Sequence, residues 1–141
     1  MKLSFHHVNL STPNVERLDV FYREVMGLAS AQQMASARVK DEGYPGAVSF
    51  LTDGATQFHI AERDLEVGYR TRKGINPVER GHLAFRTDDI SAFKARLEAQ
   101  GIPFADFGDW AMTGWQQIFF YDPDGNVVEV HEVDEEAAKL G

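Results

Sequence analysis

The sequence predicts one α+β domain made of two βαβββ modules. Three observations lead to this fold class. The chain of 141 residues matches one domain at about 150 residues per domain. Its composition, 43% hydrophobic and 26% charged, is typical of a globular protein. The sequence also contains a repeat, since His7 and its neighbours align with His82 and its neighbours at an offset of 75 residues.

The first module is predicted to cover residues 1–62, and it opens with a short strand that runs into a helix. Pro13 suits the first helical position, and apolar residues then recur at helical spacing from 15 to 25. A glycine at position 27 stops the helix. The module closes with a hairpin, because the Asp-Gly pair at 53–54 is flanked by β-branched and aromatic residues.

The second module, residues 81–133, repeats this order. A strand that contains His82 is followed by apolar residues at helical spacing from 90 to 97, until a glycine ends the helix. The closing hairpin aligns without a gap, since residues 120–130 match residues 50–60 at an offset of 70. Its turn sequence, Asp-Gly-Asn, again indicates a tight hairpin.

Two segments lie outside the modules of this single domain, residues 1–141. Residues 63–80 mix charged residues with Gly and Pro and lack clear periodicity, so we expect a linker that includes one turn of helix. Residues 134–141 are acidic and are predicted to form a short solvated helix or a frayed tail.

Charge and composition exclude several kinds of partner. The chain has 14 Lys and Arg against 22 Asp and Glu, a formal net charge of -8, so we expect no nucleic-acid partner. The absence of cysteine excludes a disulfide framework, a thiolate metal site and a cysteine nucleophile. No segment has the length and apolarity of a signal peptide or a membrane span. We therefore expect no membrane partner and a cytoplasmic location.

The repeat places four side chains that can bind metal at equivalent positions, with His7 opposite His82 and His59 opposite Glu129. The residues next to these four along each strand are apolar. Because side chains alternate along a strand, these neighbours form the face that packs on the helices. The four polar side chains must then share the other face, and a sheet curved around that face would bring them together.

The pattern alone allows two interpretations of these positions. An antiparallel sheet with one solvated face alternates in the same way, and a single histidine there is usually a surface residue. As a set, however, three imidazoles and one carboxylate form a site for a divalent first-row metal, and we favour this interpretation. His6 competes with His7 as a ligand, but it shares its predicted face with Val8 and Leu10, so the repeat selects His7.

Four motifs resemble those of the vicinal oxygen chelate superfamily, which includes glyoxalase I, methylmalonyl-CoA epimerase, fosfomycin-resistance enzymes, bleomycin-resistance proteins and extradiol dioxygenases. They are Phe-His-His-Val-Asn-Leu at 5–10, Phe-Tyr-Arg-Glu-Val-Met-Gly-Leu at 21–28, Gly-His-Leu-Ala-Phe at 81–85 with Asp-Ile at 89–90, and the stretch from Phe119 to Glu129. Together they extend over nearly the whole chain. The resemblance implies an open, cup-shaped, eight-stranded mixed barrel.

The resemblance also implies a metal-dependent, glyoxalase-like enzyme. A divalent ion (Fe, Mn, Ni, Co or Zn) would be held by His7, His59, His82 and Glu129. It would bind two adjacent oxygens of a small substrate for lyase or isomerase chemistry. We expect Glu129 to act as general base as well as ligand, with His59 as the alternative base.

Departures from the family pattern leave other activities open. Glyoxalase I usually has Glu or Gln where this chain has His59, and its glutathione-contacting Arg is Ser11 here. An Fe(II) extradiol (catechol-type) dioxygenase is an alternative, because His7, His82 and Glu129 supply a triad of two histidines and one carboxylate. A metal-free antibiotic-binding protein of the bleomycin-resistance type is a second alternative, although such proteins lack this ligand set.

Further residues are predicted to contact the substrate, from the ligand face or from the region of the last hairpin. They are Asn9, Arg86, Trp110, Trp115, Tyr121 and His131. The two Trp side chains either cover an apolar substrate or pack in the core and a dimer interface. Because modules of this kind pair edge to edge and the chain is rich in Phe, we also expect a homodimer.

Overall fold

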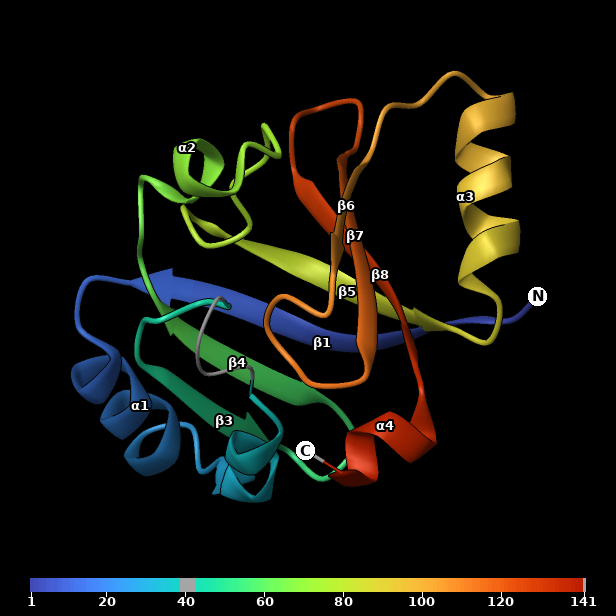
Figure 1. Cartoon of the computed structure of the whole chain (residues 1–141). Helices are drawn as coiled ribbons and strands as arrows, with labels where there is room; N and C mark the ends of the chain where they lie inside the picture. Colours follow the sequence, from blue (N-terminus) through green and yellow to red (C-terminus); the bar gives the residue numbers. More distant parts are fainter. Residues whose placement is uncertain (39–42, 141) are drawn as a thin grey trace.

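The computed structural model describes residues 1–38 and 43–140, which form an eight-stranded mixed sheet (Figure 1). The strand order is β2-β3-β4-β1-β5-β8-β7-β6. The strands are β1 (Leu3–Thr12), β2 (Ala29–Ser30), β3 (Val48–Thr52), β4 (Gln57–Glu62), β5 (Gly81–Thr87), β6 (Ala105–Gly108), β7 (Trp115–Tyr121) and β8 (Val127–Val133). β1 and β5 pair antiparallel, and each pairs in parallel with the last strand of its own module, β4 or β8.

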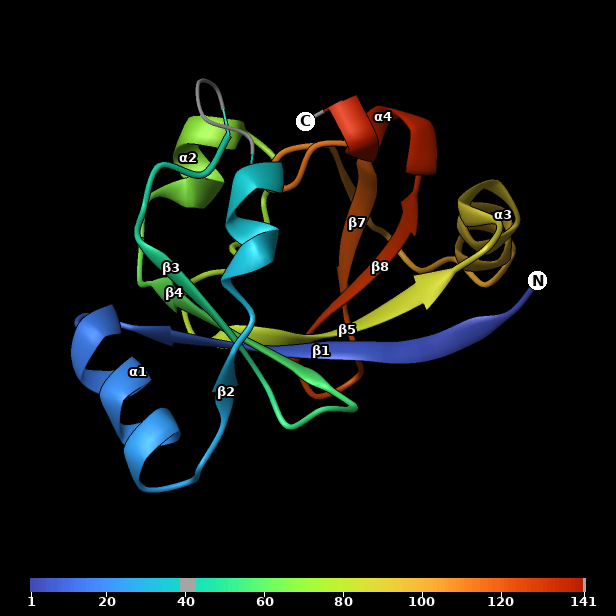
Figure 2. The ribbon, with the colours of Figure 1, turned by 90° about the horizontal axis from the view of Figure 1, so that it is seen from below.

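The sheet curves into a U in Figure 2, with β1 and β5 at its base. The helices are α1 (Val15–Glu24), the 3-10 helix η1 (Gln32–Ala37), α2 (Val67–Thr71), α3 (Ile90–Ala99) and α4 (Glu135–Leu140). Helices α1 and α3 lie on the outside of the U, whereas η1, α2 and α4 lie near its open mouth. The α+β fold with an open, mixed, eight-stranded sheet is therefore confirmed.

The two modules have the same strand register. Val8 on β1 pairs with Phe58 on β4, and Leu83 on β5 pairs with Val128 on β8. The offsets of 75 and 70 found in the sequence relate these two pairs, so the sequence repeat is also a repeat in space. Both predicted hairpins are present, one between β3 and β4 and one between β7 and β8.

Gly81 permits a close approach where the second module begins. It pairs with Leu10 across β5 and β1, and its φ of +127° lies in a region that favours glycine. A Cβ atom at this position would lie 2.0 Å from the backbone oxygen of Asn9. Any side chain here would force β1 and β5 apart, and these two strands join the modules.

The two main helices begin at capping residues. Helix α1 begins at Val15 because the side chain of Asn14 accepts a hydrogen bond from the backbone N–H of Arg17. Pro13 therefore precedes the cap and does not occupy the first helical position. Asp89 caps α3 in the same way. Helix α3 buries its predicted apolar side, Ile90, Phe93 and Leu97.

The segment between the modules is part of the core. It contains one short helix, α2, as the sequence predicts. Beyond the prediction of a linker, its Val67, Ile75 and Val78 are buried in a cluster with Phe107 of β6 and Phe119 of β7. Residues 63–80 thus contribute apolar contacts that stabilise both modules.

The end of the chain forms a short helix with acidic residues in its first turn. Helix α4 has Glu135 and Glu136 exposed in its first turn, while residue 141 lies outside the described residues.

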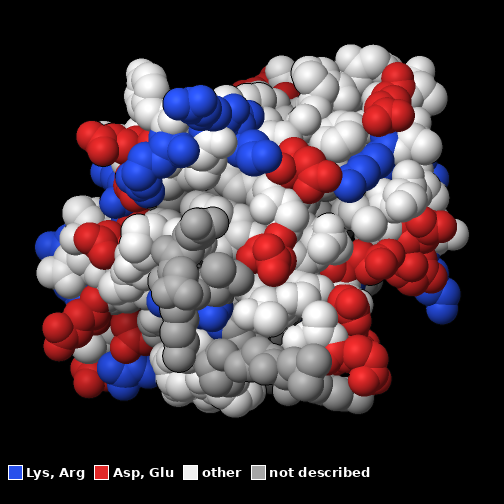
Figure 3. All heavy atoms as spheres, viewed as in Figure 1, with Lys and Arg blue, Asp and Glu red and all other residues white. Residues whose placement is uncertain are grey.

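On the face in Figure 3, acidic side chains are widely spread, and basic ones gather over α2 and the residues that follow it. Within residues 1–38 and 43–140, no helix has the length and apolarity needed to cross a membrane.

Candidate metal centre

Three of the predicted metal ligands meet on the inner face of the sheet. His7, Ala84 and Glu129 are direct neighbours across β1, β5 and β8. Because Ala84 has a short side chain, the longer side chains of His7 and Glu129 approach each other above it. Glu129 Oε1 lies 3.8 Å from His7 Nε2 and 3.0 Å from His82 Nε2, and all three side chains are buried.

The spacing of these three side chains suits a divalent metal ion. One ligand atom from each of His7, His82 and Glu129 lies within 4.8 Å of the other two. Ligand atoms about 2.1 Å from a shared ion lie about 3.0–3.4 Å apart in octahedral or tetrahedral geometry, close to the two distances above. Two imidazole nitrogens and one carboxylate oxygen are ligands that first-row divalent ions accept. The residues present therefore fit the predicted ion.

His59, the fourth predicted ligand, lies beside this group. Its ring stacks on that of His7, with ring centroids 3.8 Å apart. Its Nε2 atom is 2.9 Å from Gln57 Oε1. Among the described residues, the group whose ligand atoms converge contains His7, His82 and Glu129 without His59.

The strand pairing explains why Glu129 belongs to the converging group and His59 does not. His59 pairs with Asn9 on β1, whereas Glu129 pairs with Ala84 on β5, and Asn9 and Ala84 are themselves equivalent at the offset of 75. The larger side chain of Asn9 occupies space that Ala84 leaves open. Glu129 can therefore reach the centre of the cup, while His59 packs against a neighbouring ring.

Hydrogen bonds link Glu129 to His7 through three further side chains. His131 Nδ1 lies 2.6 Å from Glu129 Oε2, and Arg86 Nε donates to His131 Nε2 at 3.0 Å. Arg86 Nη2 is 2.9 Å from His6 Nε2, and His6 Nδ1 is 2.8 Å from His7 Nδ1. Because a guanidinium only donates, both Nε2 atoms accept, and the Nδ1–H groups of His131 and His6 donate onward. In the metal-free protein His7 therefore carries its proton on Nε2, facing Glu129, and this proton would have to leave before Nε2 could bind an ion. All five histidines of the chain surround this carboxylate.

His6 points to the inside of the cup. This corrects the prediction from strand alternation, which placed His6 on the same face as Val8 and Leu10. The register of β1 against β5 shifts between Phe5 and His7, which adds one residue to the strand and turns His6 toward the inside. The His6 ring centroid lies 4.9 Å from that of His131 and 5.3 Å from that of Trp115. No glycine or turn residue marks this bulge in the sequence.

Burial and charge set the protonation states of the ligand group. Burial lowers the pKa of His59 to about 3 and the pKa of His7 well below its usual value. For Glu129, burial opposes ionisation, but the surrounding histidines outweigh burial and hold the pKa of the carboxyl well below its usual value. At neutral pH the site thus offers the neutral imidazole of His7 and the ionised carboxylate of Glu129, forms that bind metal ions.

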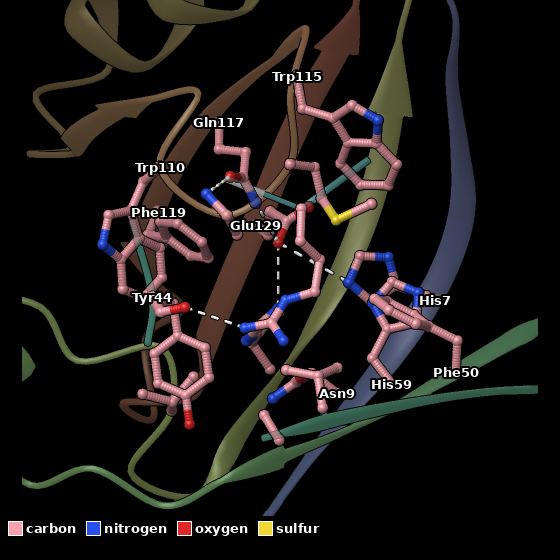
Figure 4. Close-up of a pocket in the computed structure, with 17 residues that line it drawn as sticks. His7, Asn9, Tyr44, Phe50, His59, Trp110, Trp115, Gln117, Phe119 and Glu129 are labelled. Carbon is pink, nitrogen blue, oxygen red and sulfur yellow. Dashed lines mark hydrogen bonds and ion pairs between the residues drawn. The ribbon is translucent and has the colours of Figure 1, made fainter. Parts of the chain in front are cut away.

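A small cavity opens above the ligand group (Figure 4). The cavity has a volume of about 50 Å³, which is room for a few water molecules. In Figure 4, Trp110 and Phe119 face His7 and His59 across the cavity, with Glu129 between them. A ligand in this space would therefore contact aromatic side chains on one side and imidazoles on the other.

The predicted substrate contacts lie in three different places. Three of them line the cavity: Asn9, Trp110 and Trp115. Arg86 and His131 belong instead to the hydrogen bonds behind Glu129. Tyr121 is 48% exposed and lines a separate hollow beside the turn at 122–126.

The cavity wall also contains residues that are absent from the predicted site, among them Arg38, Phe50 and Gln117. Gln117 Nε2 donates to Glu129 Oε1 at 3.3 Å, and Gln117 Oε1 accepts from the backbone N–H of Ala111 at 3.1 Å. It thereby ties the loop that carries the first Trp to the ligand carboxylate. Alternation along β7 from Trp115 to Phe119 places Gln117 on the inner face, and this signal was sufficient to find it.

Two βαβββ modules joined by their first strands, with a candidate metal site on the inner face of the cup, define the class of protein. The sequence profile of the Glyoxalase/Bleomycin resistance protein/Dioxygenase superfamily matches residues 4–130. The chain belongs to this superfamily. Among curated proteins, none matches the sequence.

Solved structures with a similar fold include methylmalonyl-CoA epimerases. A variant of the Streptomyces coelicolor enzyme in complex with 2-nitronate-propionyl-CoA is 18% identical, with a TM-score of 0.67 over 94% of this chain and 99% of its own. The Mycobacterium tuberculosis enzyme is 15% identical, with a TM-score of 0.67 over 96% and 91%. A hypothetical protein from Bacillus halodurans is 16% identical, with a TM-score of 0.64 over 94% and 95%.

The stability of the metal-free protein should fall as the pH decreases from about 6.5 to about 3. In this window unfolded His59 binds a proton that the folded protein excludes, because burial holds its folded pKa at about 3. One such group changes the free energy of unfolding by about 1.4 kcal/mol per pH unit. Urea denaturation at several pH values measures this slope, and His59→Gln should reduce it. An unchanged slope in that variant would contradict the assignment.

Proposed function

We propose that this protein is a metal-dependent enzyme that binds two adjacent oxygens of a small substrate and moves a proton, in isomerase or lyase chemistry. The observation that carries this proposal is the convergence of His7, His82 and Glu129 at the floor of a cavity. These three side chains would hold the ion. When bound, the ion would supply Lewis-acid stabilisation of negative charge on the substrate oxygens.

The surroundings of Glu129 support its role as a fixed ligand. His131 holds Oε2 at 2.6 Å, and Gln117 donates to Oε1 at 3.3 Å, so the carboxylate is oriented before any ligand enters. A divalent ion with one anionic ligand would leave a formal charge of about +1, which favours an anionic pair of substrate oxygens. Three protein ligands would leave positions for both of these oxygens.

We assign the proton transfer to His59, in place of the expected Glu129. Both oxygens of Glu129 already have partners, whereas His59 lies on the cavity wall with its Nε2 atom against the acceptor Gln57 Oε1. A neutral ring that donates from Nε2 has its lone pair on Nδ1. His59 Nδ1 would therefore take the proton, and Gln57 would hold the ring in position. Because burial holds the pKa of His59 at about 3, this transfer requires that the ion first make the substrate proton strongly acidic.

The fold neighbours favour isomerase chemistry among the activities of the superfamily. The epimerases of Streptomyces coelicolor and Mycobacterium tuberculosis resemble this chain over more than nine tenths of its length. An epimerase inverts a carbon centre by removing a proton and returning it, which requires a base beside a site that stabilises the resulting anion. His59 and the ligand group have this relation, since both line the same cavity.

An Fe(II) dioxygenase that cleaves catechols is the second candidate. The converging group of His7, His82 and Glu129 has the two-histidine, one-carboxylate composition found in non-haem Fe(II) oxygenases. The third candidate, a metal-free antibiotic-binding protein, has less support. The cavity of about 50 Å³ is far smaller than the roughly 300–1,000 Å³ of drug-sized sites.

We also propose that two copies associate through the outer face of β1 and β5. Leu3, Phe5 and Leu83 lie there between α1 and α3 with 44%, 48% and 45% of their surface exposed. Phe21 on α1 and Met26, which follows α1, are exposed as well. Association would remove this apolar surface from water, at about 25 cal/mol per Å².

Protein reconstituted with a single type of ion should bind one ion per chain, measured by plasma mass spectrometry after dialysis. Glu129→Ala and His82→Ala should lose the ion, whereas His59→Ala should retain it. Loaded protein should exchange deuterium into carbon acids next to a carbonyl, such as malonyl thioesters, without consuming oxygen. Oxygen uptake with catechols would support the dioxygenase instead, and loss of the ion from wild-type protein on dialysis would refute both.

Two isosteric changes should separate the roles of His59 and Glu129. His59→Gln keeps the metal and lowers the exchange rate by a factor on the order of 10²–10⁴, the usual cost of removing a general base. Glu129→Gln lowers the metal content, because an amide is a weaker ligand than a carboxylate. Exchange rates normalised to bound metal test this. Full turnover in His59→Gln would return the role of base to Glu129.

Light scattering at micromolar concentration should give a dimer, twice the chain mass of 15.8 kDa. Phe5→Glu combined with Leu83→Glu should give a monomer, because each change places a charge on the apolar face. Tyr69→Glu, at a side chain 85% exposed on α2, serves as the matched control and should remain dimeric. A wild-type monomer would contradict the proposed association.

A further inference from the structure

Arg38 lies on the wall of the same cavity as the candidate metal ligands. Among the described residues that line this cavity, it is the only Lys or Arg, and Glu129 is the only Asp or Glu. Neither the ligand group nor the proposed proton transfer uses Arg38. A cation in this position therefore calls for a separate explanation.

The backbone fixes Arg38 and leaves part of its guanidinium available. Its main chain bridges to Met112 across the mouth of the cup. Its Nη2 atom donates to the backbone oxygens of Tyr44 at 2.9 Å and Gly46 at 2.8 Å. Its Cζ atom lies 5.9 Å from the centroid of the Tyr44 ring. Within residues 1–38 and 43–140, no hydrogen-bond partner is found for its Nε and Nη1 groups, and no carboxylate pairs with it. Arg38 is thus anchored by one nitrogen and has further N–H donors to offer.

The charge balance of the cavity favours an anion beside Arg38. With a divalent ion bound, the ion and Glu129 would give a formal charge of about +1, and Arg38 would raise it to about +2. The whole chain, in contrast, carries a net charge of -8. A half-buried guanidinium in a largely apolar wall is costly without an anionic partner, and a bound ligand can supply one.

We propose that the substrate carries a carboxylate in addition to the two oxygens that would bind the metal, and that Arg38 binds this carboxylate. The inference rests on the proposed function for the two oxygens, but the contact with Arg38 does not depend on the metal. A planar carboxylate matches the fork of N–H groups on a guanidinium. The cavity of about 50 Å³ further limits the substrate to a small acid near the metal.

Two probes that differ by one carboxylate test this proposal. Glycolate has two adjacent oxygens, and tartronate has the same two and a second carboxylate. In cobalt-loaded protein, titration followed by the visible absorption of the ion should show tartronate binding at least about 10-fold more tightly than glycolate, as for a hydrogen-bonded ion pair. Arg38→Gln should remove this preference while the cobalt content stays unchanged.

Matched variants separate the effect of position from that of charge. Arg17→Gln removes one positive charge from the exposed face of α1 and should keep the preference for tartronate. Arg38→Lys keeps the charge and one donor to the backbone oxygens, and it should give an intermediate preference. It also replaces Arg38→Gln as the test if that variant fails to fold. A wild-type preference in Arg38→Gln, or in a folded Arg38→Lys used in its place, would overturn the proposal.

A metal-free titration keeps this test independent of the metal. Malonate added to metal-free wild-type protein should shift the NMR signals of the residues around Arg38 in a saturable way, and Arg38→Gln should abolish the shift. If the chain binds no divalent ion, the proposed function fails and this titration alone decides the role of Arg38. Equal malonate binding by wild type and Arg38→Gln would overturn that role.

Discussion

The buried carboxylate of Glu129 is the constraint on which the rest of the site depends. An ionised carboxylate removed from water is costly unless hydrogen bonds and opposite charges compensate it. Here the partners come from three other strands and from β8 itself: His7, His82, Gln117 and His131. The sheet must curve to bring these strands around one point. The burial of this charge therefore depends on the curvature of the sheet.

Arg86 and His6 act on Glu129 through the side chains that surround it. Arg86 donates to both His6 and His131, and these two rings contact His7 and Glu129. One guanidinium thus orients a candidate ligand from the first module and a candidate ligand from the second. Groups that orient metal ligands in this way usually affect metal affinity strongly. The bulge in β1 serves the same purpose, because without it His6 would face the helices.

The sequence repeat was sufficient to predict the order of strands and helices in each half and three side chains that converge, because alternation and equal offsets act over short distances along the chain. Contacts that depend on irregular backbone could not be predicted in this way. His6 required a bulge without a sequence signature, and Arg38 follows a 3-10 helix with no apolar period. The buried residues of 63–80 were missed because a segment without periodicity carries no sign of burial.

The departure from perfect repetition gives the site its chemical asymmetry. At one pair of equivalent positions the chain has His59 beside Asn9, and at the other it has Glu129 beside Ala84. The small residue admits a carboxylate to the centre, while the larger residue keeps an imidazole at the edge of the cavity. Two modules with identical side chains would place four equal ligands around one point. The difference between Asn9 and Ala84 instead leaves the imidazole of His59 outside the converging group, on the wall of the cavity.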